Sequence, residues 1–339
     1  MRIDREKVRA PEIGRLWLNS PPLSLRQLRG KAVLIDFWDY TCVNCIRTLP
    51  YAQAWHERYA AKGLVVIGIH TPEFTFAQYE SNVERGVREF GLTYPIVIDS
   101  NYELWKAFAN KYWPAKYLID KEGYIRGAHF GEGAYAETEQ IIQELLREIN
   151  PAVELPAIME PLRDADLPDA VCFRPTPELY LGYRRGRIGN QSGFHEDGAG
   201  EYSISGEPQE NFFYVQGTWN STAEYLESAS ANGKIVLPYS AGGVNLVMAS
   251  RSQQPIQVLL RQDGKPLSKA SATAETKFSS DGSSYITVER ARMYALVDND
   301  SFAAHTLELL PQGAGVSMYA FTFTTCVEKP SATIAGAER

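Results

Sequence analysis

The first 150 residues alternate apolar runs with segments of helical spacing. Buried strands are predicted over about 32–38 in "KAVLIDFW", and again in "GLVVIGIH" and "YPIVIDS". Helices are predicted over about 42–60, where Pro50 interrupts the pattern, over 76–90, and in "YELWKAFANKY". The stretch "AKYLIDKEGYIRGAHFG" predicts a hairpin, and the apolar stripe over 141–149 predicts a closing helix. This alternation indicates a mainly parallel sheet covered by helices on both faces, with an antiparallel edge.

Beyond residue 150 the helical stripes disappear. A cluster of prolines predicts an extended linker over 151–170, because proline fixes φ and lacks an amide hydrogen. Short alternating segments follow, from "NFFYVQGTW" to "VSMYAFTFTTC", and turn dipeptides such as Asn232-Gly233 separate them. This pattern is typical of an antiparallel sandwich or jelly roll. The predicted domains are therefore an α/β domain over 1–150 and an all-β domain over 171–328, with a frayed tail over 329–339.

Composition and charge exclude several classes of protein. The chain has 339 residues, which favours about two domains, and its 44% hydrophobic and 22% charged residues are ordinary for a globular protein. A formal net charge of -7 argues against nucleic acid as a partner. No apolar run approaches the roughly 18 residues that span a bilayer. The first residues alternate charges and lack the apolar core of a signal peptide, which predicts a cytoplasmic location. A trimmed periplasmic or extracytoplasmic domain would show the same feature.

Cys42 and Cys45 stand two residues apart in "TCVNC", between a predicted strand and a predicted helix. A structural zinc site needs a second pair of ligands, and the five histidines are scattered, so we predict neither a metal nor a cofactor. A structural bridge would close too short a loop to constrain the unfolded chain. Redox chemistry fits better, because the helix N-terminus favours a thiolate at Cys42 and lowers its expected pKa. Cys45, one turn later, would then attack a mixed disulfide at Cys42.

Three further positions extend this pattern. Asp36 lies within an apolar strand, Pro50 within the helix, and Trp113-Pro114 just before a strand in "YWPAKYLID". Together with "LWLNSPPLSLRQLRGKAVLIDFWDYTCVNCIRTLPY" and "GIHTPEF", these residues resemble the thioredoxin superfamily, and most of all its TlpA-like and DipZ-type members. The resemblance implies a thioredoxin fold followed by a sandwich that is similar to a carbohydrate-binding module. It also implies a thiol–disulfide oxidoreductase, whose partners are a disulfide-containing protein substrate and an upstream thiol reductant.

The resemblance also implies roles for individual residues. Cys42 would attack, Cys45 would resolve, and Asp36 would exchange a proton with Cys45. Pro114 would follow a cis peptide bond and, with Trp113, dock a substrate strand by β-pairing. Two plainer alternatives stay open from the residues alone: Asp36 as a strand-edge residue that reaches water, and Pro114 as an ordinary trans proline.

His70 and Glu73 follow a parallel strand and should lie at the same sheet edge as Cys42, where open α/β sheets bind ligands. They are candidates for contact with substrate, and a plain loop with a helix-entry proline is an equal alternative. The fold also hosts thiol peroxidases. Their Pro-x-x-x-Thr-x-x-Cys signature is absent, because Ile35 and Asp39 occupy the positions of the proline and the threonine.

The second domain shows no spacing typical of acid–base pairs or metal sites. We expect it to serve recognition or placement. The rival hypothesis is a carbohydrate- or partner-binding protein in which the thioredoxin fold is a scaffold, with a glycan on exposed aromatic rings. The candidate rings are Tyr180, Tyr183, Trp219, Tyr225 and Tyr239. Cys172 and Cys326 flank this domain, and both a bridge and two free thiols fit the sequence; a reducing cytosol would favour free thiols.

Overall fold

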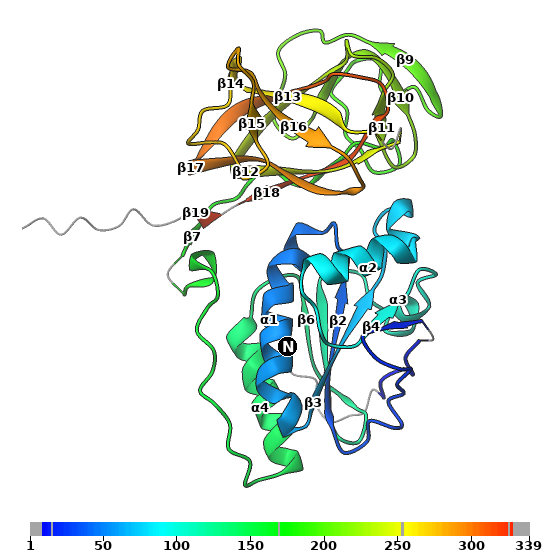
Figure 1. Ribbon diagram of the computed structural model, residues 1–339, viewed down its shortest axis with the longest axis vertical. Coiled ribbons are helices and arrows are strands. Elements are labelled where there is room, and N and C mark those ends of the chain that lie inside the picture. The colour runs from blue at the N-terminus through cyan, green and yellow to red at the C-terminus, as the bar shows by residue number, and fades with distance from the viewer. Residues whose placement is uncertain (1–8, 15, 169, 252–253, 325, 328–339) are drawn as a thin grey trace, which may run out of the picture. The chain divides into compact units, whose positions relative to one another are not determined.

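The computed structural model describes residues 9–14, 16–168, 170–251, 254–324 and 326–327 (Figure 1). The chain divides into two compact units, Met1–Arg163 and Asp164–Arg339. The predicted tail over 329–339 lies outside the described residues.

The first unit is a mixed six-stranded sheet with helices on both faces. Its strands are β1 (Trp17–Leu18), β2 (Ala32–Trp38), β3 (Leu64–His70), β4 (Ile96–Ile98), β5 (Ala115–Ile119) and β6 (Ile125–Phe130). Its helices are α1 (Val43–Tyr59), α2 (Glu80–Glu89), α3 (Glu103–Ala107) and α4 (Tyr135–Ile149), with short 3₁₀ turns η1 (Ala60–Lys62) and η2 (Thr75–Gln78).

The strand order β1-β4-β3-β2-β5-β6 puts β2 at the centre of this sheet. β2 runs parallel to β3 and antiparallel to β5, while β5 and β6 form the predicted hairpin. β1 pairs antiparallel with β4, and the sequence did not predict it. Alternate residues of β2 enter two different cores, one beneath α1, α2 and α4 and the other beneath α3 and the N-terminal segment. Because both faces are covered, every residue of β2 is buried.

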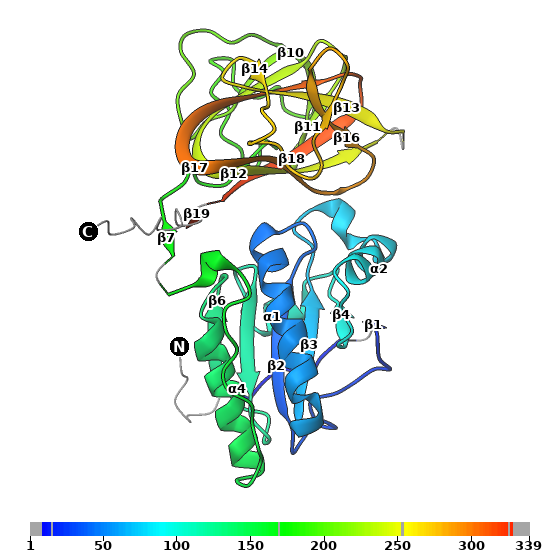
Figure 2. The same ribbon diagram turned by 60° about the vertical axis from the view of Figure 1, so that its left-hand side comes forward.

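The segment after α4 is extended, as predicted, but it lies on the first unit. Half-buried Val153, Leu155 and Met159 pack on the core beneath α1 and α4. The Met159 amide donates to the buried Glu139 carboxylate at 2.9 Å, and the Leu162 amide donates to the Tyr51 hydroxyl at 2.8 Å. The first unit therefore extends to Arg163, beyond the predicted boundary at residue 150. Figure 2 shows this segment running beside α4.

The second unit is all-β, as predicted. After the 3₁₀ turn η3 (Asp164–Asp166), its strands are β7 (Val171–Cys172), β8 (Leu179–Tyr180), β9 (Gly198–Tyr202), β10 (Tyr214–Ser221), β11 (Leu226–Ser228), β12 (Lys234–Ser250), β13 (Ile256–Gln262), β14 (Lys265–Pro266), β15 (Lys277–Phe278), β16 (Ser284–Val288), β17 (Arg292–Pro311), β18 (Val316–Thr324) and β19 (Cys326–Val327).

Two long strands organise this unit. β12 and β17 each join two segments that the sequence pattern separates, and irregularities at 241–243 and 244–245 bend their ladder. The first half of β12 pairs with β10 and its second half with β18, so one strand serves two layers of an eleven-stranded sheet. The layers enclose one apolar core (Figure 1). Its members include Trp219 and Tyr239, each with no exposed surface.

β7 and β19 form a separate two-stranded ladder in which Cys172 stands opposite Cys326 in the backbone register. Cys172 is disulfide-bonded. The expectation of a free thiol at this position is therefore wrong. Antiparallel register brings opposite Cα atoms within the range that a disulfide needs, which a sequence separation of this size does not reveal.

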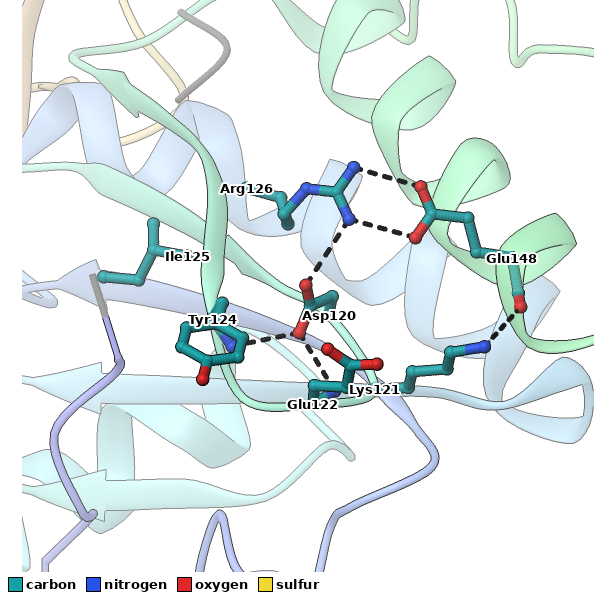
Figure 3. Close-up of a pocket in the computed structure, with 7 residues that line it drawn as sticks. All are labelled: Asp120, Lys121, Glu122, Tyr124, Ile125, Arg126 and Glu148. Atoms are coloured by element: carbon teal, nitrogen blue, oxygen red, sulfur yellow. Dashed lines mark hydrogen bonds and ion pairs between the residues drawn. The ribbon is translucent and has the colours of Figure 1, made fainter. Parts of the chain in front are cut away.

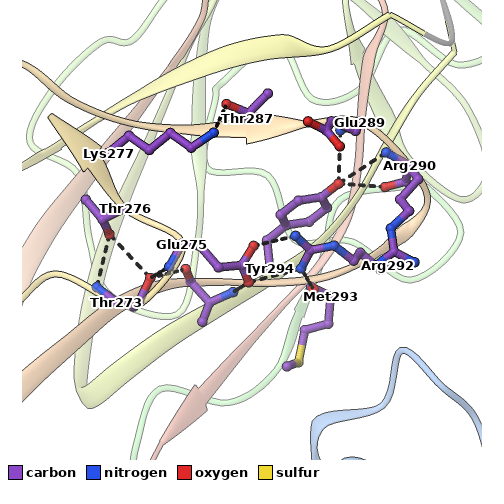
Figure 4. A network of polar contacts seen from close by, with 11 residues as sticks. Thr273, Glu275, Thr276, Lys277, Thr287, Glu289, Arg290, Arg292, Met293 and Tyr294 are labelled. Carbon is purple, nitrogen blue, oxygen red and sulfur yellow. Dashed lines mark hydrogen bonds and ion pairs between the residues drawn. The ribbon is translucent and has the colours of Figure 1, made fainter. Parts of the chain in front are cut away.

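A salt-bridged network lies on the second unit near β15 and β17 (Figure 4). The Arg292 guanidinium donates to both oxygens of Glu275 and lies 3.7 Å from the Tyr294 ring centroid. Glu275 also accepts from the Ala295 amide at 3.0 Å, and the Tyr294 hydroxyl donates to the Arg290 carbonyl at 2.8 Å. Every charged group in this set has a partner, so the network fixes the loop before β15 onto β17.

Candidate active site

Cys42 is the N-cap of α1, and Cys45 lies one turn further on. The Cys45 amide points at the Cys42 sulfur at 3.4 Å, as expected at a helix N-terminus whose first amides lack backbone partners. Both thiols are free; Cys42 is partly exposed, and Cys45 has no exposed surface. The two sulfurs thus differ in access, which suits an attacking and a resolving thiol.

The predicted low pKa of Cys42 is wrong for this conformation. A hydrogen bond from the Cys45 thiol lowers the pKa of Cys42, but burial and the nearby carboxylates of Glu73 and Asp39 outweigh it, and the pKa lies above its ordinary value. Burial and the hydrogen bond to Cys42 raise the pKa of Cys45 much further. The effect of the helix N-terminus on the pKa of Cys42 is therefore opposed by two carboxylates from the neighbouring loops.

Asp36 is buried, as predicted, and points into the same core layer as Cys45. Its side chain is 1% exposed, and burial raises its pKa from 3.8 to about 7, against the opposing effect of Lys116. Among the described residues, neither carboxylate oxygen has a hydrogen-bond partner. The interpretation of Asp36 as a strand-edge residue that reaches water is therefore wrong. A carboxyl group with a pKa near neutrality can both hold and release a proton.

Asp39 organises the loop that precedes Cys42, and the sequence analysis gave it no role. One of its oxygens accepts from the Thr41 amide at 2.6 Å, and the other accepts from the Glu73 amide at 2.9 Å. This second bond ties the loop after β3 to the cysteine loop. A signal for this residue exists in the sequence, because Asp39 and Thr41 have the spacing of an Asx turn.

Glu73 and His70 lie at the predicted sheet edge but in different environments. Glu73 is half-buried and close enough to Cys42 to raise its pKa. His70 is fully buried, stacks on Tyr40, and has a pKa that burial lowers to about 3. Its Nε2 lies 3.6 Å from the Asp39 carboxylate. A neutral ring with no exposed surface supports the loop and offers no surface to a substrate.

The Trp113–Pro114 peptide bond is cis, as predicted, and the alternative of a trans proline is wrong. The Trp113 indole donates to the Thr71 carbonyl at 2.9 Å, which ties this loop to the loop after β3. The Pro114 carbonyl accepts from the Gly131 amide at 2.8 Å. Trp113 and Cys42 both pack against the core beneath α1. The described residues give no hydrogen bond to the backbone of Trp113.

Lys116 is a charged residue of this site that the sequence analysis missed. It stands opposite Asp36 in the β2–β5 register and is 1% exposed. The signal was available in the sequence, because a lysine in the strand "AKYLI" is as costly to bury as an aspartate in "VLIDFW".

A pocket of about 500 Å³ lies elsewhere on the first unit, around the β5–β6 turn and the end of α4 (Figure 3). Arg126 pairs with Glu148 at 3.0 Å and with Asp120 at 3.4 Å, and Lys121 donates to the Glu148 carbonyl. β5 begins at Ala115, which pairs with Phe37 just before the cysteine loop. The β5–β6 turn follows the other end of β5. The pocket therefore lies at the opposite end of the sheet from Cys42.

In the parts of the chain that the structure describes, no group of three or more histidine, cysteine, aspartate or glutamate side chains could hold a metal ion. Among the helices of the same residues, none combines the length and the apolar character needed to cross a membrane.

The chain is similar to several known proteins. The AhpC/TSA family model matches residues 9–128, and the model of the thioredoxin-like C-terminal domain matches residues 176–324. The DipZ proteins of Mycobacterium bovis and Mycobacterium tuberculosis are 34% identical over 312 residues, which is 91% of this chain but 41% of theirs. The thiol-disulfide oxidoreductase ResA of Halalkalibacterium halodurans is 31% identical over 134 residues, 40% of this chain and 71% of its own. The structure of a thiol-disulfide isomerase of Corynebacterium glutamicum matches with 26% identity and a TM-score of 0.37, covering 40% of this chain and 96% of its own.

The fold and the cysteine pair define a thioredoxin-like redox protein. The chain belongs to the TlpA/ResA-type family of thioredoxin-like thiol–disulfide oxidoreductases, which confirms the resemblance in the sequence. It also spans less than half the length of the DipZ proteins that it matches over both units.

The buried carboxyl group of Asp36 makes stability depend on pH. Its pKa is raised from 3.8 to about 7 in the folded state, so the folded chain retains a proton that the unfolded chain releases as the pH rises between these values. The free energy of unfolding should therefore fall by about 4 kcal/mol between pH 4 and pH 8 relative to Asp36→Asn. Urea unfolding of the reduced protein, followed by tryptophan fluorescence, measures this difference. Five of the six tryptophans lie in the first unit. The exposed Glu122→Gln is the control and should track wild type; parallel pH curves for wild type and Asp36→Asn would refute the burial argument.

The carboxylate of Glu73 should slow the reaction of Cys42 with alkylating agents. Because the negative charge raises the pKa of Cys42, Glu73→Gln should increase the thiolate fraction at pH 7. We expect iodoacetamide to label Cys42 about two- to fivefold faster, as for the loss of one negative charge near a thiol. Mass spectrometry after short exposures measures the rate, with the exposed Glu80→Gln as control. An equal rate in Glu73→Gln and wild type would show that this carboxylate does not act on the thiol.

Proposed function

We propose that this chain reduces disulfides in a protein partner through Cys42 and Cys45. The observation that carries the proposal is the pair itself: a partly exposed thiol at the N-terminus of α1 and a fully buried thiol one turn later, beside a carboxyl group with a pKa of about 7. Family membership supports the same chemistry.

The reaction needs two exchanges. The Cys42 thiolate attacks one sulfur of the partner's disulfide, forms a mixed disulfide, and releases the other sulfur as a thiolate that takes up a proton. Asp36 then accepts the proton of Cys45, whose thiolate attacks Cys42 and releases the partner's second sulfur as a thiolate that takes up a proton. Cys42 and Cys45 end as an intramolecular disulfide, and the partner ends as a dithiol. We propose that an upstream dithiol reductant restores the pair to its reduced form.

The loop at Trp113 and Pro114 supports docking of an extended segment of the partner. The backbone of Trp113 has no hydrogen bond from the described residues, so its amide and carbonyl suit β-pairing with an incoming strand. Glu73 lies close to Cys42 and contributes a negative charge at the docking edge. We assign His70 to support of the Asp39 loop, because its ring is buried.

A thiol peroxidase is the second candidate, since the AhpC/TSA family model matches the first unit. Two features of the site favour a dithiol reductase instead. The peroxidase proline and threonine are replaced by Ile35 and by Asp39, which is itself buried and bonded within the loop. Consumption of hydrogen peroxide by the reduced protein, with no need for a disulfide substrate, would favour the peroxidase.

The second unit is proposed to recognise or place the partner. Two of the five aromatic rings proposed to bind a glycan, Trp219 and Tyr239, are buried in the core and cannot contact a sugar. Of the rest, Tyr180 has the Arg185 guanidinium 3.4 Å from its ring centroid, which occupies one face of the ring. A protein surface therefore suits this unit better than a sugar.

We also propose an extracytoplasmic, oxidising compartment in place of the predicted cytosol. The disulfide at Cys172 supports it, because stable disulfides persist in oxidising compartments and are rare in the cytosol.

The trapped intermediate tests the proposed reaction. Cys45→Ser should accumulate a mixed disulfide at Cys42, because no second thiol can resolve it, while Cys42→Ser should lose reduction of disulfides altogether. Non-reducing gels and mass spectrometry identify what stays attached. Trapping of partners by Cys42→Ser through Cys45 would reverse the two roles, and trapping by neither variant would reject the reaction.

The role of the second unit has its own test. Residues 1–163 alone should reduce a small disulfide reagent as fast as the whole chain, because the chemistry lies in the first unit. On the partner trapped above they should be slower. The chain is cut at 163 so that the docked segment stays in place. Equal rates on the trapped partner would remove the recognition role from the second unit.

A further inference from the structure

The disulfide at Cys172 lies at the surface of the second unit, because Cys172 is exposed. Cys42 and Cys45 are free, which leaves Cys326 as its partner in a chain with four cysteines. Cys326 also stands opposite Cys172 in the backbone register of β7 and β19. Exposed disulfides are in general the ones that thiols reduce readily, whereas structural ones resist reduction. The exposure of Cys172 therefore makes this bond a candidate acceptor for a thiol.

The two cysteines lie outside the core of the second unit. β7 and β19 pair with each other in a separate two-stranded sheet and take no part in the eleven-stranded one (Figure 2). The buried core of the described residues begins at Leu179 and ends at Phe323. A two-stranded ladder is marginally stable by itself. Reduction of the disulfide should therefore open this ladder and leave the core intact.

The segment that follows Cys172 has the properties that the proposed docking loop at Trp113 requires. It contains no helix or turn, and Pro175 favours an extended backbone at the residue before it. Among the described residues, none makes a hydrogen bond to the backbone of Phe173 or Arg174. The Phe173 side chain is 47% exposed. An exposed segment with unpaired backbone groups suits β-pairing.

Arg174 carries a charge that complements the docking edge. It is exposed and makes no ion pair with another described residue. Glu73 and Asp39 place negative charge close to Cys42 and raise its pKa. Complementary charges of this kind speed the encounter and fix the register of two partners. A cation two residues after Cys172 would therefore favour the approach of its sulfur to Cys42.

We propose that the disulfide at Cys172 is a second redox site of this protein, which the dithiol of Cys42 and Cys45 reduces. The inference rests on the dithiol function proposed above and deepens it, because it names a substrate of that dithiol within the protein itself.

The transfer needs two exchanges. The Cys42 thiolate attacks the Cys172 sulfur and forms a disulfide with it, while the Cys326 sulfur leaves as a thiolate that takes up a proton. Asp36 accepts the proton of Cys45, whose thiolate attacks Cys42 and releases the Cys172 sulfur as a thiolate that takes up a proton. The first unit ends with a Cys42–Cys45 disulfide, and the second unit ends with two thiols. Two electrons have passed between them.

The test is the rate at which dithiothreitol reduces the disulfide at Cys172 in the oxidised full-length protein. Samples are quenched with N-ethylmaleimide, and mass spectrometry counts the label on Cys172. In wild type the reagent also reduces the Cys42–Cys45 pair, which passes the electrons on, whereas in Cys42→Ser it must act directly. Two groups on one chain have an effective concentration of about 1 mM, so against about 0.1 mM dithiothreitol we expect about tenfold faster labelling in wild type.

A trapped intermediate identifies the attacked sulfur. Purified Cys45→Ser, with no other protein present, should form a disulfide between Cys42 and Cys172, because the resolving thiol is missing. Peptide mapping without reductant detects this product, and N-ethylmaleimide should label Cys326. The product is monomeric on a non-reducing gel if the exchange takes place within one chain and dimeric if it takes place between two copies; each form supports the transfer.

Arg174→Gln tests the docking of the segment. It should slow the labelling that depends on the dithiol about two- to fivefold, the range for one exposed charge pair, and slow direct reduction in a Cys42→Ser background less. The exposed Arg184→Gln, on the same unit, is the control and should match wild type. Equal slowing by the two variants would remove Arg174 from the docking.

The outcomes separate the inference from the function on which it rests. Equal labelling rates in wild type and Cys42→Ser, or no Cys42–Cys172 product in Cys45→Ser, overturns the inference, and the dithiol function stands if the same wild-type sample reduces a small disulfide reagent. A wild-type protein that fails to reduce this reagent rejects the proposed function itself. Faster labelling in wild type together with the Cys42–Cys172 product supports the second redox site.

Discussion

The removal of ionisable groups from water is the constraint on which this site depends. The sheet and α1 enclose a carboxyl group, a thiol and an ammonium group in one apolar layer, and each would be far more stable in solvent. Burial keeps Cys45 protonated, brings the pKa of Asp36 to about 7, and makes the opposite charge of Lys116 matter at close range. The same burial requires a rigid surrounding, which the central position of β2 between two covered faces provides.

Carboxylates in the loops next to this layer act against the N-terminus of α1 in setting the pKa of Cys42. An N-terminal helix position favours a thiolate, yet the Cys42 thiol has two carboxylates nearby and is partly buried. The Asp39 carboxylate is retained because it joins the cysteine loop to the loop after β3. The carboxylate that holds the loops together therefore also makes Cys42 less acidic, and in the reduced form the pKa of Cys42 lies above its ordinary value.

The sequence predicted whatever depends on local pattern, and the differences arise where distant segments meet. Asp36 stood out because a charge interrupted an apolar strand, but its partner Lys116 required the register of two strands that are far apart in the chain. The prolines after residue 150 correctly indicated an extended segment. They could not show that the Met159 amide of this segment donates to Glu139 on α4. In the second unit β12 and β17 continue through bends that resemble turns in the sequence.

The docked segment between residues 150 and 163 also determines which part of the chain can be inherited as a unit. Its apolar side chains cover the core beneath α1 and α4. Its Met159 amide donates to the Glu139 carboxylate, which is 1% exposed. A gene fusion or duplication that separated the first domain at Asn150 would leave that carboxylate and its apolar surroundings bare, and the product would be prone to self-association. Recombination that preserves a working thioredoxin-like module should therefore carry the proline-rich segment with it, as part of the module.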